Sequence, residues 1–418
     1  MSRTLTKKLA SVKPGTLFIG VDLALDHNVA VVLTERAHRL ARFGFPNDRD
    51  GYDYFYRRLE ALRERQQAPE VLVGMEPTNY FWKLLAADLE QQQVPYRLVN
   101  PYTVKKHREG DQLDRSKDDS RDAFTIGDLL RTGKFTETRL LRGGYAELRQ
   151  YVVLYDRLQR DIRRQKALIH NTAGQVFPEL TRVFKDFTGV TALAMLRHHA
   201  AAAVVRRMSQ EAFITGVRAD LQGKRLQLAR LRRAHRLATH SVGLKSGVQA
   251  LQLALRLYIE TLEGLQRQLE EVKTALIDTF LALPESRYLL SVHGLGLVTA
   301  AIILAEIGDP NNYSNGRQLI KLAGTQPVTN TTGRKTRSKT PMSHKGRSRL
   351  RTALFFAVMR LVQVDDAFAQ EYLRLQQREK NPLTKMQALG VLMNKLLRIL
   401  WALMRHRTFY NPGYQHAA

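Results

Sequence analysis

The first third of the chain alternates short apolar runs with amphipathic stretches. Apolar or alternating runs predict strands at residues 16–24, 29–34, 39–45, 70–75 and 96–100. Helical spacing of apolar residues follows at residues 48–66 and 79–92. Three strands in a row, followed by helices and strands in alternation, predict a mixed α/β sheet covered by helices. Residues 102–118 are expected to form a basic polar loop, with a further helix beginning near Asp119.

The spacing of apolar positions changes to three and four from about Leu148 onward. This helical pattern runs to Ile169 and returns between Leu251 and Leu276 as an unbroken heptad series. Such a series forms either an antiparallel hairpin within the chain or a coiled coil between subunits, and its regularity favours self-association. Residues 178–245 lie between the two series and form a basic helical insert. Its surface is either a phosphate-contacting face or an ordinary solvated helix.

The last third is predicted to be helical. Residues 291–309 have the pattern of a helix, a Gly-rich turn and a second helix. The segment HGLGLVTA is typical of a helix-hairpin-helix, in which Gly294 and Gly296 let backbone amides approach a phosphate. A plain helix–helix turn has a similar pattern. After a polar stretch, two long helices are expected over about residues 348–377 and 383–406.

These changes of pattern divide the chain into three predicted domains. An α/β domain is expected over residues 1–142, and an all-α coiled-coil region with the basic insert over residues 143–283. Residues 284–418 are expected to form a helical C-terminal domain with the helix-hairpin-helix-like element.

Composition indicates the kind of partner. The 418 residues include 66 Lys and Arg against 39 Asp and Glu, which gives a formal net charge of +27. This excess favours a polyanionic partner, because contacts with phosphates release counterions. Cysteine is absent, which excludes disulfides and cysteine–zinc sites. No apolar core of signal-peptide length and no membrane-spanning uncharged run is found, so a cytoplasmic protein without a membrane partner is expected.

Four acidic residues occur where open α/β sheets place ligands. Asp22 ends the first strand and Glu76 ends the fourth, whereas Asp119 and Asp122 begin the next helix on one face. Each acid alone has an ordinary explanation as a helix or turn cap. Four carboxylates meeting at one edge would repel each other unless divalent cations lay between them, and hard oxygen ligands suit Mg²⁺. The pattern therefore predicts a metal-dependent site that acts on phosphodiesters.

Several short segments carry a more specific pattern. The first third contains FIGVD, GMEPT, VNPYTVKKH and SKDDSRDA, and the last third contains SVHGLGLVTAAIILAEIGD, RQLIKLAGTQPV and MSHKGRSRLRTAL. In order and spacing, these segments resemble the transposases and recombinases of the insertion-sequence 110 family. The first group resembles that family's RuvC-like DEDD motif, and the second group is typical of its C-terminal domain.

The resemblance implies an RNase H/RuvC-like N-terminal domain, similar to Holliday-junction resolvases, and a helical C-terminal transposase domain. It implies that Asp22, Glu76, Asp119 and Asp122 bind Mg²⁺, or Mn²⁺ in its place, and orient the scissile phosphate. Family members act on double-stranded target and donor DNA, and many use a structured non-coding guide RNA, the bridge RNA. The C-terminal domain of one subunit completes the site of another. A homodimer or homotetramer at the bacterial nucleoid is therefore expected.

The chain departs from the family pattern at the nucleophile. Where the family has a serine that attacks DNA, this chain has Thr332, just before Gly333. A threonine hydroxyl is able to attack phosphorus, although its methyl group crowds an in-line approach. The alternatives are a weakened variant, a nucleophile at Thr331 or Ser338, and a hydroxyl that only contacts a DNA phosphate.

A basic run surrounds Thr332 without an intervening acid. Its cations are expected to neutralise the scissile phosphate and the charge that develops during attack, although a solvated surface run is the plainer explanation. The candidate nucleic-acid-binding residues are Arg334, Lys335, Arg337, Lys339, Lys345, Arg347, Arg349 and Arg351.

The sequence as a whole predicts an RNA-guided, site-specific DNA recombinase that moves its own insertion sequence. Two other classes of protein fit the same residues. A structure-specific endonuclease would cut branched DNA with the four acids alone. A catalytically weakened derivative would only bind nucleic acid.

Overall fold

The computed structural model describes residues 10, 12–111, 119–136, 140–221, 223, 225–328, 331–332, 335–336 and 340–413. The chain divides into two compact units, Met1–Leu140 (unit 1) and Leu141–Ala418 (unit 2). The division into three domains stays a prediction.

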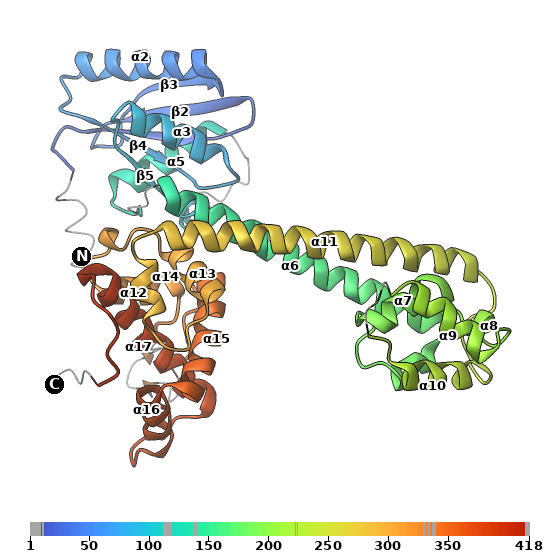
Figure 1. The fold of residues 1–418 in the computed structure, drawn as a ribbon. Coiled ribbons are helices and arrows are strands. Elements are labelled where there is room, and N and C mark those ends of the chain that lie inside the picture. Colours follow the sequence, from blue (N-terminus) through green and yellow to red (C-terminus); the bar gives the residue numbers. More distant parts are fainter. Residues whose placement is uncertain are drawn as a thin grey trace. The chain divides into compact units, whose positions relative to one another are not determined.

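Unit 1 is built on a mixed five-stranded sheet (Figure 1). Its strands are β1 (Leu17–Asp22), β2 (His27–Leu33), β3 (Arg39–Pro46), β4 (Val71–Met75) and β5 (Tyr96–Leu98). They lie in the order β3-β2-β1-β4-β5. The first three strands pair antiparallel, whereas β1 pairs in parallel with β4 and β4 with β5. The predicted mixed α/β sheet is therefore confirmed.

Helices cover both faces of this sheet. They are α2 (Arg49–Arg65) and α3 (Phe81–Gln91) on one face, and α4 (Pro101–Asp111) and α5 (Asp119–Arg131) on the other. Alternate residues of each strand supply the two cores. Ile19 and Val73 pack in the core with α2 and α3, whereas Phe18 and Leu72 pack in the core with α4 and α5.

The prediction of a loop at residues 102–118 is wrong for residues 102–111, which belong to α4. Asn100 provides the start of this helix, because its side-chain oxygen accepts a hydrogen bond from the Tyr102 amide at 2.9 Å. Pro101 suits the first turn, where its fixed φ is helical and its missing N–H costs nothing. The Asn-Pro pair was thus a helix start signal that the polar composition concealed. The remainder of the predicted loop lies outside the described residues.

Unit 2 contains a long antiparallel hairpin of α6 (Gly143–Val176) and α11 (Val248–Ala282) (Figure 1). Its two ends belong to two separate cores, which contain Leu148, Leu276 and Phe280 at one end and Ile169, Leu255 and Ile259 at the other. The two heptad series therefore pack against each other within one chain, as the first of the two interpretations expected. Self-association along these helices stays a prediction.

Short helices enclose one end of the hairpin, in the place of the predicted basic insert. They are η1 (Pro178–Arg182), α7 (Val190–His199), α8 (Ala202–Val205), α9 (Gln210–Ala219) and α10 (Leu228–Ala238). Their core is built around the fully buried rings of Phe177, Phe187 and Phe213.

The opposite end of the hairpin packs with the C-terminal helices. These are α12 (Ser286–Leu290), α13 (Leu297–Ile307), η2 (Pro310–Asn312), α14 (Gly316–Ala323), α15 (Ser348–Val364), α16 (Asp366–Gln377) and α17 (Lys385–His406). The prediction of a single helix over residues 348–377 is wrong, because the helix is interrupted at Asp365. This residue has an extended backbone, and its side chain caps α16 by accepting a hydrogen bond from the Phe368 amide at 3.1 Å.

Among the described residues, α17 is the one helix long and apolar enough to cross a membrane. Its apolar face packs in the core of unit 2, where Leu392, Leu396 and Leu400 are fully buried. A core helix passes the same test of length and composition, so this finding is weak evidence for a membrane span.

Candidate active site

Asp22 and Glu76 occupy adjacent positions at the ends of two hydrogen-bonded strands. Val21 of β1 lies opposite Met75 of the parallel strand β4, and Asp22 and Glu76 are the next residues along each chain segment. Neighbouring strands lie about 4.8 Å apart, so two such positions are close together. Both residues are partly exposed. The register thus places two of the predicted acids at one edge of the sheet.

Glycines allow α5 to lie directly on β1 and β4. A Cβ atom at Gly20 would lie 1.9 Å from the carbonyl oxygen of Ala123 and 2.4 Å from the amide nitrogen of Gly127. Gly74 lies beside Gly20 on β4, and a Cβ atom there would lie 3.0 Å from Cδ2 of Leu130. A glycine in a strand interior often marks such a close approach of another backbone. Glycine at position 20 therefore sets the spacing between α5 and the strand that ends at the first acid.

The direction of α5 brings its N-terminal end to the same edge of the sheet. A Cβ atom at Gly127, further along α5, would lie 3.0 Å from Cδ1 of Leu33, which pairs with Phe18 near the beginning of β1. Ala123, near the start of α5, lies over Gly20 closer to the end of that strand. Asp122 directly precedes Ala123 and is 9% exposed. The helix therefore runs antiparallel to β1, and Asp122 lies at the carboxyl edge where Asp22 and Glu76 end their strands.

Asp119 is the first residue of α5, one helical turn before Ala123 and on the same side of the helix. Its side chain lies outside the described part of the structure. Among the side chains that are described, no three acidic or histidine residues form a group that could hold a metal ion. The four-carboxylate metal site therefore stays a prediction. Its donor set fits Mg²⁺, because carboxylate oxygens are the hard ligands that this ion prefers.

Asp128, which sequence reasoning missed, joins α5 to α4. Its carboxylate lies 3.0 Å from Nε2 of His107 and accepts a hydrogen bond from Nε of Arg131 at 3.0 Å. Burial acts to raise the pKa of Asp128, but the hydrogen bonds from His107 and Arg131 outweigh burial, so its pKa lies below the usual value. The ionised carboxylate thus helps to hold α4 against the helix that carries Asp122.

Thr332, the predicted nucleophile, lies in a short hairpin of unit 2. β6 (Thr331–Thr332) pairs antiparallel with β7 (Lys335–Thr336), and the register sets Thr332 opposite Lys335. The structure describes the backbone of these four residues and not their side chains. Four further candidates, Arg334, Arg337, Ser338 and Lys339, lie outside the described residues.

Backbone hydrogen bonds join the two arms of this hairpin below β6 and β7. The amide of Val328 donates to the carbonyl oxygen of Pro341 at 2.8 Å. The side chain of Asn394 in α17 donates to the carbonyl oxygen of Thr325 at 3.2 Å and so fixes the base of the hairpin to a core helix. Lys345, just after the second arm, is exposed and suits the predicted contact with a phosphate.

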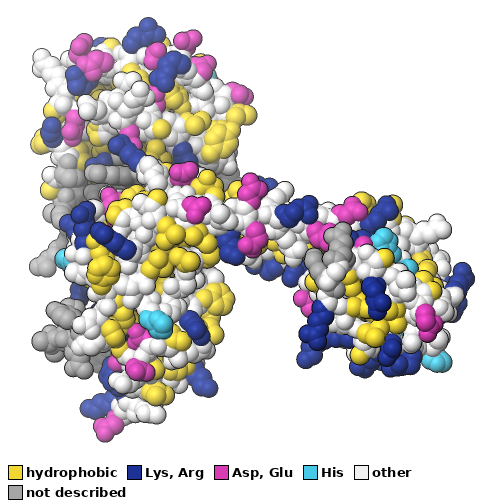
Figure 2. Space-filling view, viewed as in Figure 1, with side chains coloured by type: hydrophobic (Ala, Val, Ile, Leu, Met, Phe, Trp, Pro, Cys, Tyr) yellow, Lys and Arg dark blue, Asp and Glu magenta, His cyan; other side chains and the backbone are white. Residues whose placement is uncertain are grey.

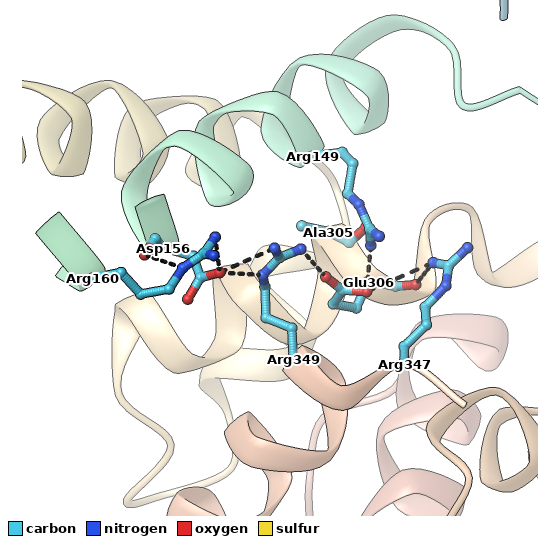
Figure 3. A network of polar contacts seen from close by, with 7 residues as sticks. All are labelled: Arg149, Asp156, Arg160, Ala305, Glu306, Arg347 and Arg349. Carbon is cyan, nitrogen blue, oxygen red and sulfur yellow. Dashed lines mark hydrogen bonds and ion pairs between the residues drawn. The ribbon is translucent and has the colours of Figure 1, made fainter. Parts of the chain in front are cut away.

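Glu306 of α13 lies among three arginines (Figure 3). Its side chain is only 1% exposed. Oε1 lies 3.0 Å from Nη1 of Arg349, Oε2 contacts Arg149, and the backbone carbonyl accepts a hydrogen bond from Arg347. Burial lowers the pKa of Arg149 despite the attraction of Glu306. This cluster joins α6, α13 and the start of α15.

The last three basic candidates all have acceptors within the protein. Besides the contact of Arg347 with Glu306, Arg349 donates to Asp156 at 3.1 Å and Arg351 donates to the carbonyl oxygen of Ala323 at 2.8 Å. These guanidinium groups bind protein acceptors, and their contact with a DNA phosphate stays a prediction. Glu306, within the segment AEIGD, was the only sequence signal of this arrangement, and its partners could not be read from the sequence.

The Gly-rich turn lies between α12 and α13. Gly294 has φ +94°, and a Cβ atom there would lie 2.4 Å from Cγ2 of Val364, so both conformation and packing require glycine. Gly296 is exposed and is the N-cap residue of α13. The backbone conformation and packing of the turn explain why residue 294 is a glycine. Phosphate binding at Gly294 and Gly296 stays a prediction.

Two regions of the chain match known transposase families. Residues 19–178 match the DEDD transposase family of IS110, and residues 286–373 match the transposase family of IS116, IS110 and IS902. Two separate regions of the chain are thus similar to transposase domains of the IS110 family. The first matched region contains all four predicted acids and Arg149, and the second contains Thr332 and Glu306.

Individual relatives agree with these matches. An uncharacterised 43.6-kDa protein of insertion element IS110 from Streptomyces coelicolor is 25% identical over 300 residues, which cover 71% of this chain and 72% of the relative. An uncharacterised 44.8-kDa protein of IS116 from Streptomyces clavuligerus is 24% identical over 417 residues, or 96% and 98% of the two chains. A pilin gene-inverting protein from Moraxella lacunata is 31% identical over 127 residues, or 29% of this chain and 38% of the relative. The transposase domains and these likenesses support an enzyme that rearranges DNA.

Proposed function

We propose that the chain is a metal-dependent, site-specific DNA recombinase of an insertion sequence, guided by a structured non-coding RNA. The observation that carries the proposal is the placement of Asp22, Glu76 and Asp122 at one edge of the sheet by strand register and by the close approach of α5. The net charge of +27 supports nucleic acid as the partner, and the likeness to IS110 transposases supports DNA as the substrate. RNA guidance and a homodimer or homotetramer follow from the family resemblance.

In this proposal, the residues of the two units have different tasks. Asp22, Glu76, Asp119 and Asp122 hold Mg²⁺ or Mn²⁺ and orient the scissile phosphate. The bound ion supplies Lewis-acid stabilisation of the charge that develops on the phosphoryl oxygens. The hydroxyl oxygen of Thr332 loses its proton and forms a bond to phosphorus, while the bridging oxygen of the broken strand leaves and takes up a proton. Attack by a hydroxyl of the other DNA strand reverses these steps and releases Thr332.

A denaturing gel with purified protein, labelled element-end DNA and Mg²⁺ tests the proposal. We expect a protein–DNA adduct that disappears when EDTA replaces Mg²⁺ and in the Asp122→Asn variant. Asp26→Asn is the matched control, because Asp26 is an exposed acid in the turn after β1. Adduct formation without divalent cations, or an undiminished adduct in Asp122→Asn, contradicts the metal-dependent mechanism.

The RNA is tested separately. RNA that co-purifies with the protein is sequenced, and one dominant species is expected. Ribonuclease treatment before addition of DNA should abolish the adduct. A mixture of unrelated RNAs together with ribonuclease-resistant activity contradicts guidance and leaves the recombinase proposal standing.

Threonine at the position of the family's serine favours a second candidate, a structure-specific endonuclease that uses the four acids alone. The same gel distinguishes the two, because the endonuclease leaves free cut ends and forms no adduct. Neither product is expected of a protein that only binds nucleic acid.

A further inference from the structure

Residues 179–247, which we name the tip module, lie at one end of the hairpin of α6 and α11 (Figure 1). The module falls outside both transposase matches, which end at residue 178 and begin again at residue 286. It has a well-packed interior, in which Leu196, Val205 and Phe213 are almost fully buried. A folded module of this size calls for a function that the two transposase domains do not supply.

The tip module is strongly basic. It contains 13 Lys and Arg against 4 Asp and Glu. Three of these acids are engaged inside the module: Glu179 accepts a hydrogen bond from Ser241 at 2.6 Å, Asp186 from Thr188 at 2.6 Å and Asp220 from Arg197 at 3.2 Å. The acids therefore neutralise little of the basic surface, which is left to attract an anion.

Helix α10 carries the densest part of this surface. Leu231, Ala234 and Ala238 face the core, and the arginines between them face solvent. The exposed arginines are Arg225, Arg230, Arg232, Arg233 and Arg236. In Figure 2, Lys and Arg side chains gather along the edge of the tip module that α10 forms. Arg232 and Arg236 are one helical turn apart, a spacing of roughly 6 Å that suits successive phosphates of one nucleic acid strand.

These arginines have no acidic partner within the described residues. The structure records ion pairs for Arg197 with Asp220 and Glu263, whereas Arg232, Arg233 and Arg236 form none. A hollow of about 690 Å³ lies at the beginning of α10 and is lined by Thr191, Arg225, Gln227 and Arg230 together with apolar residues. The basic face thus continues past the N-terminal end of the helix.

Exposed phenylalanine, tyrosine and tryptophan side chains, the usual stacking platforms for unpaired bases, are absent from this surface in the described part of the module. Its Phe residues are Phe184, Phe187 and Phe213, each at most 3% exposed, and its exposed rings are the histidines His198 and His240. Sequence-tolerant binding of single strands uses exposed rings as stacking platforms. A surface of arginines without exposed Phe, Tyr or Trp instead suits the backbone of a double helix, where phosphates position the protein without reading the sequence.

We propose that the exposed face of α10 binds the phosphate backbone of duplex DNA without sequence preference. Charge complementarity supports an anionic duplex, and the transposase domains of the chain support DNA as that duplex. The proposal is independent of the carboxylates and of Thr332, since binding requires no metal and no bond formation. The tip module would hold DNA at the end of the hairpin opposite the C-terminal helices of unit 2.

The test measures binding of the full-length protein to a random-sequence DNA duplex of roughly 30 base pairs, by fluorescence anisotropy in EDTA over a series of salt concentrations. The variant is R232Q/R233Q/R236Q. Loss of three phosphate contacts is expected to reduce the slope of log K against log salt by about 3 units and to weaken binding at low salt by about tenfold or more. The three side chains are exposed, so an unchanged melting temperature is expected for the variant.

Two further variants make the result specific. R57Q/R58Q/R65Q removes the same charge from exposed positions of α2 in unit 1 and is expected to leave the salt slope unchanged. R232K/R233K/R236K keeps the charge and is expected to restore most of the slope. An unchanged slope in R232Q/R233Q/R236Q overturns the proposal, as does an equal loss in the α2 variant. A loss confined to duplex RNA of the same length also overturns it, because RNA would then be the occupant.

Discussion

Gly20 of β1 and Ala123 of α5 approach so closely that no side chain fits between them. A Cβ atom on residue 20 would lie 1.9 Å from the carbonyl oxygen of Ala123. The obstacle is backbone, which cannot rotate away as a flexible side chain could. The contact lies two residues before Asp22 and one residue after Asp122, so it fixes the separation of two predicted metal ligands.

Gly20→Ala is therefore expected to destabilise unit 1 by about 3 kcal/mol or more, at the upper end of the cost of overpacking. Urea unfolding of the full chain measures the loss, which should appear in the transition of unit 1. Gly174→Ala is the matched control, because nothing lies within 4 Å of a Cβ atom at this glycine of α6. Its expected effect is a gain of about 0.5–1 kcal/mol from helix propensity. Wild-type stability in Gly20→Ala contradicts the close approach.

Asp122→Asn is expected to remove a ligand of the predicted metal site without unfolding the protein. Mg²⁺ that binds only the folded state raises the melting temperature, and the rise depends on the ratio of free ion to its dissociation constant. The rise should shrink strongly in Asp122→Asn and persist in the Asp26→Asn control. Thermal unfolding with and without millimolar Mg²⁺ measures both. An equal rise in wild type and Asp122→Asn excludes this residue as a ligand.

Glu306→Gln is expected to destabilise unit 2 by about 3 kcal/mol. The carboxylate is 1% exposed, and its removal leaves Arg149 and Arg349 near each other without their shared anion. Breaking a buried pair costs more than the pair contributes, since an uncompensated charge stays behind. Chemical denaturation measures the change.

Glu371→Gln is the control for Glu306→Gln, because its partner Arg374 is solvent-exposed on the same helix. Exposed ion pairs contribute little to stability, and little change is expected. Equal losses of unfolding free energy in the two variants would show that burial does not increase the contribution of Glu306 to stability.

The tip module should lose stability in mild acid through His199. Burial lowers the pKa of His199, and the neighbouring His198 lowers it further. Its ordinary value is 6.5. At a pH between the lowered pKa of His199 in the folded chain and the ordinary value of 6.5, the unfolded chain binds a proton that the folded chain does not. The stability present above pH 6.5 is therefore lost as pH falls through the folded pKa. Melting temperature measured from pH 7.5 downward should fall in wild type.

A variant separates this effect from other titrations. The dependence on pH should flatten in His199→Leu and persist in His240→Gln, which changes an exposed histidine. The groups nearest His199 are His198, whose own partner is Asp220, and the rings of Phe213 and His235 behind it. Identical pH profiles in wild type and His199→Leu would assign the loss to another group.

The elements of unit 1 were predictable because their signals are local. Five apolar runs gave five strands, and the two faces of each strand followed from alternation. The placement of acids at strand ends also followed, since parallel strands end at a common edge. The helix at residues 101–111 was missed because a polar composition outweighed its Asn-Pro start, and the break at Asp365 was missed because one capping residue interrupts an otherwise continuous helical pattern.

The contacts of the basic segment after Thr332 were not predictable from the sequence. Arg349 binds Asp156, 193 positions earlier in the chain, and binds Glu306 in another helix. A run of cations has the same appearance in sequence whether it faces phosphates or buried carboxylates. The antiparallel pairing of α6 with α11 accounts for the contact between Arg349 and Asp156, because the hairpin brings Asp156 back to the C-terminal helices. Long-range pairing of this kind leaves no periodic signal.

Thr332→Ser is expected to speed formation of the protein–DNA adduct, and Thr332→Ala is expected to abolish it. Both hydroxyl residues supply the same attacking oxygen, but the methyl group of threonine restricts χ1 and crowds the in-line approach to phosphorus. Removal of that methyl group should raise the rate of adduct formation about tenfold, which corresponds to about 1.4 kcal/mol of activation free energy. Single-turnover reactions resolved on a denaturing gel measure the rate. Thr331→Ala is the matched control, because Thr331 precedes Thr332 in the same strand and loses the same groups. An adduct that survives in Thr332→Ala and disappears in Thr331→Ala would identify Thr331 as the nucleophile. An adduct in both variants would show that the nucleophile is not a residue of β6.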